Sequence, residues 1–116
     1  MKTARGDIVL VLFPNSDLRT AKRRPAIVIQ RDGLATGLDQ TLIAMVSSNV
    51  GRRGHPSRIY LPLNSPEARG TGLRLDSVIM ADNLATVLDS EIEMLLGRLP
   101  DMTALNAALK YTLGVS

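Results

Sequence analysis

The chain has 116 residues, of which 45% are hydrophobic and 22% charged, as is typical of one globular domain, here expected over residues 1–116. It has no cysteine, which excludes disulfides and thiolate chemistry, and its one histidine with scattered carboxylates cannot form a usual zinc site. The net charge is +3. The acidic Asp7 precedes any long apolar run, and no stretch approaches about 20 apolar residues, so we expect no signal peptide and no membrane segment. The lack of cysteine fits the expected cytoplasmic location.

Short apolar runs bounded by turn residues predict strands along most of the chain. The predicted strands are residues 8–13, 25–30, 41–47, 58–61 and 76–81. The polar, basic stretch 16–23 predicts a loop. Residues 84–87 either continue the fifth strand or begin another, and residues 92–99 are ambiguous.

The end of the chain predicts one helix. Asp101 can cap it by accepting backbone N–H bonds, and Gly114 can end it. An apolar stripe at helical spacing runs along Met102, Leu105, Ala108, Leu109, Thr112 and Leu113. These elements predict a mainly β domain with some α structure: a small SH3-like barrel of five to seven strands with a C-terminal helix.

Basic and small polar residues cluster at the ends of two predicted strands. Lys22, Arg23 and Arg24 precede the second strand, and Ser47, Ser48 and Asn49 end the third. If these strands are antiparallel neighbours, a guanidinium faces hydroxyl and amide groups at one rim of the sheet. Such a site could hold a phosphodiester and stabilise charge on its oxygens, although these residue types are also common in turns.

The distribution of charge agrees with a polyanion-binding surface. Residues 1–75 hold twelve of the fourteen Lys and Arg but only five of the eleven Asp and Glu. Eleven of the basic residues are arginines, whose planar guanidinium can bind two phosphate oxygens at once. Charge alone, however, favours an ordinary solvated surface.

Several other chemistries find no support. The sequence contains no Walker-type phosphate loop and no strand–GxGxxG–helix unit. The two serines have no evident His and Asp partners for a hydrolase triad, and His55 in its loop is expected to be a surface residue. Aromatic residues make up only 3% of the chain, too few for base-stacking platforms.

Five segments together resemble the MazF/PemK toxin family. They are residues 6–9 (GDIV), 24–30 (RPAIVIQ), 46–49 (VSSN), 76–87 (DSVIMADNLATV) and 96–99 (LGRL). Each motif is loose, but the ordered set is specific and covers nearly the whole chain. The resemblance implies a homodimeric, growth-inhibiting toxin of a type II toxin–antitoxin system. It also implies sequence-specific cleavage of single-stranded RNA by 2′-OH attack, with no metal or other cofactor.

The resemblance also assigns roles to residues. The family's catalytic arginine falls on Arg24, and its hydroxyl residue, usually threonine, falls on Ser47, with Ser48 as the second candidate. The alternative for Arg24 is a strand-end arginine paired with a carboxylate such as Asp76.

The remaining candidates are RNA-binding residues. Base edges would be read by Gln30, Asn49 and Asn83, and phosphates would be contacted by Lys22, Arg23, Arg52 and Arg53. The alternatives are local hydrogen bonding for the amides and solvated loop charge for the cations. The implied protein partner is an antitoxin whose acidic, disordered tail lies along the same basic groove as RNA.

Two non-enzymatic functions compete with the ribonuclease. One is a toxin-fold protein that binds a protein target, as related inhibitors of DNA gyrase do. The resemblance links their activity to a C-terminal tail that carries a tryptophan, and this chain has no tryptophan, which argues against that mode. The other is a decayed toxin that only binds RNA or antitoxin.

Overall fold

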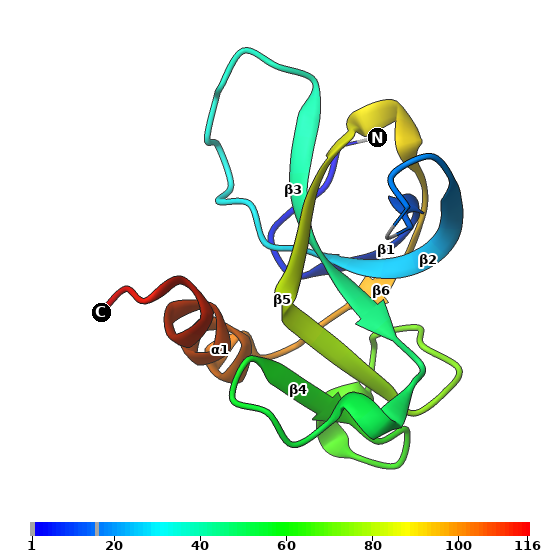
Figure 1. Cartoon of the computed structure of the whole chain (residues 1–116), viewed down its shortest axis with the longest axis vertical. Coiled ribbons are helices and arrows are strands. Elements are labelled where there is room, and N and C mark those ends of the chain that lie inside the picture. Colours follow the sequence, from blue (N-terminus) through cyan, green and yellow to red (C-terminus); the bar gives the residue numbers. More distant parts are fainter. Residues whose placement is uncertain (1, 16) are drawn as a thin grey trace.

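The computed structural model describes residues 2–15 and 17–116, and in these residues one sheet and one terminal helix form the fold (Figure 1). The strands are β1 (Asp7–Pro14), β2 (Ala21–Val28), β3 (Gln40–Ser47), β4 (Arg58–Leu61), β5 (Ser77–Leu88) and β6 (Ile92–Arg98). The helix is α1 (Thr103–Leu113), and the short 3-10 turns are η1 (Val50–Arg52), η2 (Pro66–Ala68) and η3 (Asp89–Glu91).

The sheet has the order β4-β5-β3-β2-β1-β6, and every neighbouring pair is antiparallel. It curves strongly but does not close, since β4 and β6 are its edges. The prediction of a small SH3-like fold with a C-terminal helix is confirmed.

A bulge in β5 produces much of this curvature. Ala44 of β3 pairs with Leu84, whereas the next residue, Met45, pairs with Met80. Residues 81–83 of β5 therefore have no counterpart in β3, and such an insertion bends a strand. Figure 1 shows β5 changing direction between its two halves. Residues 84–87 continue the fifth strand, which was one of the two alternatives.

Both predicted boundaries of the second strand are wrong. The second strand begins at Ala21, not Pro25, and ends at Val28, so the predicted loop 16–23 includes strand residues. Lys22 and Arg23 pair with Phe13 and Leu12 of β1. The first three residues of β2 are exposed. Their backbone pairing with β1, rather than burial of apolar side chains, therefore makes them part of a strand. The ambiguous region 92–99 is mostly β6.

The sheet packs a core on each face. Alternate residues of β1 divide between them, with Ile8 in one cluster and Val9 in the other, because successive strand side chains point to opposite faces. The cluster around Ile8 and Ile79 also holds Leu105 of α1. Full burial of an aliphatic side chain of this size contributes about 1.5–3 kcal/mol.

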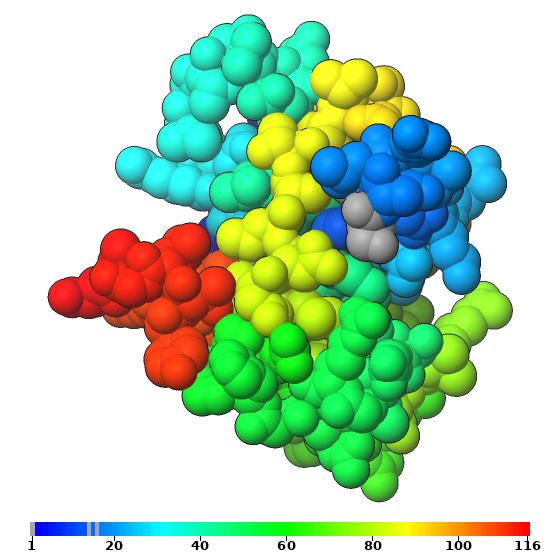
Figure 2. Space-filling model, viewed as in Figure 1, coloured from blue at the N-terminus to red at the C-terminus, as the bar shows by residue number. Residues whose placement is uncertain are grey.

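Helix α1 ends as predicted, but its N-cap is Met102, whose side chain makes no capping hydrogen bond. The expected capping residue, Asp101, lies one residue earlier and still accepts a backbone hydrogen bond. The Thr103 N–H donates to Asp101 Oδ1 at 2.9 Å, and Gly114 ends the helix at a φ of 69°. Leu105, Ala108 and Leu109 are buried as expected. Leu113 is 59% exposed, contrary to the predicted stripe, because the last turn projects from the body of the protein (Figure 2, red). In the described part of the chain, no helix is long and apolar enough to cross a bilayer.

Candidate functional site

A cleft of about 570 Å³ opens where β2 begins and β3 ends. Seven predicted site residues line it: Lys22, Arg23, Arg24, Ser47, Ser48, Asn49 and Arg52. The opposite wall comes from segment 72–77 and from β6. The cleft therefore joins residues from four separate parts of the chain.

Strand register brings Arg24 and Ser47 to the same rim. Strands β2 and β3 are antiparallel, and Ala26 pairs with Met45. Two residues further along, β2 reaches Arg24 and β3 reaches Ser47. The ladder stops at Ala26, next to Pro25, which has no N–H to donate. The two side chains therefore line the open end between the strands.

The two candidate hydroxyls have different surroundings. Ser47 is buried, and its Oγ accepts a hydrogen bond from the Asn49 N–H at 3.1 Å. Asn49 in turn caps η1, with Oδ1 accepting from the Gly51 N–H at 3.1 Å. The turn thus holds Ser47 in place and leaves its hydroxyl hydrogen able to be donated. Ser48 lines the cleft but is exposed.

Neighbouring arginines differ in their partners. The Arg23 guanidinium forms an ion pair with Glu93 at 2.7 Å, and this hydrogen bond, together with the charge attraction, raises the pKa of Arg23. Arg24 has no carboxylate partner among the described residues; its Nη2 donates to the amide oxygen of Asn15 at 3.3 Å. Asp76 instead accepts from the Leu63 N–H, so the alternative pairing with Arg24 does not form.

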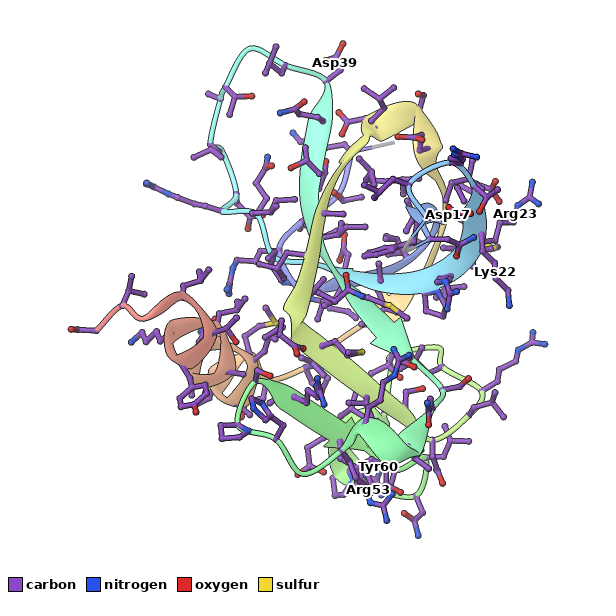
Figure 3. All side chains as sticks on the ribbon, in the orientation of Figure 1. Asp17, Lys22, Arg23, Asp39, Arg53 and Tyr60 are labelled. Atoms are coloured by element: carbon purple, nitrogen blue, oxygen red, sulfur yellow. The ribbon has the colours of Figure 1, made fainter. Side chains whose placement is uncertain are left out.

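Three predicted RNA-binding residues lie outside the lining of this cleft. Arg53 lies over the Tyr60 ring at 5.6 Å, away from Lys22 and Arg23 (Figure 3). Gln30 lines a second cleft beside the β2–β3 loop, and Asn83 Nδ2 lies 3.0 Å from a methionine sulfur in the core. Their contact with RNA stays a prediction.

Sequence reasoning missed the far wall of the cleft. Its members are Gly72, Leu73, Arg74, Leu75, Met94 and Leu96. Leu75 is 62% exposed and Met94 49%, so an apolar surface lies beside the basic side chains. The sequence of segment 64–72 predicts only turns. Its glycines were the one feature that could have indicated this wall, because they permit close contact with β6.

The lone histidine lies away from the cleft lining. His55 Nδ1 accepts a hydrogen bond from the Ser57 N–H at 3.1 Å, and its ring meets Tyr111 edge-on at 6.1 Å. It thus links the segment before β4 to α1. Within residues 2–15 and 17–116, no three His, Cys, Asp or Glu side chains come together as a potential metal site.

The fold and the cleft define a small, open SH3-like β protein with a cleft lined by basic side chains at the rim of its sheet. An unneutralised guanidinium, a held hydroxyl and further cations suit a phosphodiester, and the apolar wall suits a base. Residues 4–113 match the family described as PemK-like, MazF-like toxin of type II toxin–antitoxin system. The chain belongs to this family of toxins.

Individual relatives agree with this assignment. The chain is 32% identical over 90 residues to endoribonuclease MazF2 of Mycobacterium bovis and, equally, to MazF6 of Mycobacterium tuberculosis, covering 77% of this chain and 75% of each relative. Its fold is similar to the Mycobacterium tuberculosis toxin MazF-mt6, with a TM-score of 0.74, 21% identity and coverage of 95% and 98%. It is also similar to MazF from Deinococcus radiodurans, with a TM-score of 0.73, 22% identity and 99% of both chains covered.

Proposed function

We propose that this protein is the toxin of a type II toxin–antitoxin pair and a sequence-specific endoribonuclease, acting in the cytoplasm as one domain over residues 1–116. It cleaves single-stranded RNA without a metal and so inhibits growth. The observation that carries this proposal is the shared cleft of Arg24 and Ser47, in which Arg24 has no carboxylate partner among the described residues. The relatives named endoribonuclease support it.

The chemistry follows from a guanidinium beside a phosphodiester. The RNA 2′-oxygen attacks the adjacent phosphorus; the 2′-O–P bond forms, the P–O5′ bond breaks, and the 2′-OH loses its proton while the 5′-oxygen gains one. The products are a 2′,3′-cyclic phosphate and a 5′-hydroxyl. A guanidinium carries only hydrogen-bond donors, so Arg24 would stabilise charge on the phosphate oxygens and would not serve as a general base. Such a donor contributes about 2.7–4 kcal/mol to the transition state.

The remaining cleft residues would bind the RNA. The Ser47 hydroxyl, or that of Ser48, donates to the phosphate. Lys22 and Arg52 contact flanking phosphates, and the apolar wall accommodates a base. Gln30, Arg53 and Asn83 would contact only nucleotides that extend beyond the cleft.

The same cleft would bind the protein partner. An antitoxin with an acidic, disordered tail competes with RNA for the basic side chains and orders when it binds. Similar folds include an endoribonuclease in complex with its cognate antitoxin from a mycobacterial species and a MazE–MazF structure from Deinococcus radiodurans. We propose that the toxin itself is a homodimer.

The decisive experiment is cleavage of labelled single-stranded RNA of varied sequence in excess EDTA. Wild-type protein is expected to release fragments with cyclic phosphate ends. Arg24→Ala is expected to cleave about 100-fold or more slowly, since one transition-state donor is removed. Arg69→Ala, which removes an exposed arginine outside the cleft lining, is the matched control. Intact RNA with tight antitoxin binding would favour a non-catalytic binder.

A further inference from the structure

The hairpin between β1 and β2 gives its two adjacent arginines different partners. Arg23 Nε lies 2.8 and 2.7 Å from the two carboxylate oxygens of Glu93, so its charge is compensated. Arg24 instead donates through Nη2 to Asn15 Oδ1, a neutral acceptor. Arg24 is half-buried, and Asn15 comes from the far side of the hairpin loop.

Other bonds determine which end of the Asn15 amide faces Arg24. The Thr20 hydroxyl lies 3.1 Å from both Asp17 carboxylate oxygens and donates to that carboxylate. Because its hydrogen is used there, the hydroxyl oxygen can only accept from Asn15, and Asn15 Nδ2 donates to it at 2.9 Å. The amide oxygen is then directed to Arg24.

The hairpin holds this short network together. The Asn15 N–H donates to the Thr20 carbonyl at 3.0 Å. The Arg19 and Thr20 N–H groups donate to Asp17 and are the main reason that the pKa of Asp17 lies below its ordinary value. Asp17 is thus an ionised acceptor at neutral pH.

We propose that Asn15 is a positioning residue for the ribonuclease reaction: it orients the Arg24 guanidinium toward the cleft without neutralising it. This inference rests on the proposed function. A carboxylate at position 15 would orient the guanidinium equally well but would compete with the phosphate for its charge, as Glu93 does at Arg23. The neutral Asn15 amide orients the Arg24 guanidinium, and the positive charge of that guanidinium remains available to interact with the phosphate of the substrate.

The test compares Asn15→Ala and Asn15→Asp with Asn64→Ala and Asn64→Asp, since Asn64 is an exposed loop residue outside the cleft lining. The kcat and KM for RNA cleavage are measured, together with the Kd for the same RNA made uncleavable by 2′-O-methylation. Asn15→Ala is expected to lower kcat about tenfold with little change in KM or Kd. Asn15→Asp is expected to raise Kd about tenfold, since a charge-assisted contact to phosphate is weakened.

Each other outcome overturns the inference. If both Asn15 variants behave like the Asn64 pair while wild-type protein cleaves RNA, Asn15 has no such role and the proposed function stands. If both lose activity alike together with a large fall in Tm, the residue only stabilises the hairpin. If wild-type protein leaves the RNA intact, the proposed function fails and this inference fails with it.

Discussion

The main chain of Gly72 lies directly against the carbonyl group of Leu96, with no room for a side chain between them. A methyl group on Gly97 would likewise overlap the main chain of residues 70–71. The Arg98 N–H donates to the Gly70 carbonyl at 2.7 Å. Segment 70–75 is therefore held against β6, and this packing makes it a wall of the cleft.

Gly72→Ala is expected to destabilise the protein more than Gly33→Ala. Both glycines have a left-handed backbone, with φ of 72° and 67°, so both variants incur about 1–2 kcal/mol of conformational strain. Only at Gly72 does the added methyl meet rigid main chain, which contributes about 1–3 kcal/mol more. Urea unfolding measures the difference. Equal destabilisation would mean that segment 70–75 can move off β6.

Ser47→Ala is expected to reduce RNA cleavage about tenfold or more, and Ser48→Ala much less. The reason is that Ser47 is buried and held by the Asn49 N–H, whereas Ser48 is exposed. Ser47→Thr should remain active, because the hydroxyl is kept and the added methyl restricts its rotamer. Single-turnover cleavage rates test this, and the reverse ranking would assign the hydroxyl to Ser48.

Arg74→Ala is expected to weaken RNA binding and to reduce its salt dependence. Arg74 lines the cleft, and removing one cation that neutralises a phosphate makes the slope of log K against log salt shallower by about 0.7 for a single strand. Titrations of uncleavable RNA at several salt concentrations give the slope. An unchanged slope relative to wild type and Arg69→Ala would place Arg74 away from the phosphates.

The Asp82–Arg58 ion pair is expected to make stability depend on pH in acid. The two side chains are 2.8 Å apart, and the hydrogen bond from Arg58 is the main reason that the pKa of Asp82 lies below its ordinary value. A carboxyl whose folded pKa is depressed stabilises the protein above its unfolded pKa of about 3.9, and this stabilisation disappears as pH falls through the folded pKa. Tm measured from pH 7 to 2 should fall less steeply below about pH 4 in Asp82→Asn. Parallel curves would show that the pair contributes nothing.

The sequence by itself determined the local elements of this protein. The short apolar runs 8–13 and 41–47, the helical spacing of Leu105 and Leu109 and the terminal Gly114 are local patterns, each decided by a few neighbouring residues. The placement of Arg24 beside Ser47 likewise needed only that β2 and β3 be antiparallel neighbours.

Tertiary structure alone decided the far wall of the cleft, the bend of β5 and the partners of each arginine. Arg74 and Met94 are twenty residues apart and meet at the cleft only because glycines let segment 70–75 lie on β6. Likewise, Arg23 forms an ion pair with Glu93, whereas Arg24 donates a hydrogen bond to Asn15. Strand β1 lies between β2 and β6, and adjacent side chains of a strand point to opposite faces of the sheet, so the two arginines meet different partners. Such contacts form when segments that are distant in the sequence pack together, and the periodicity of the local sequence does not indicate which distant segments will meet.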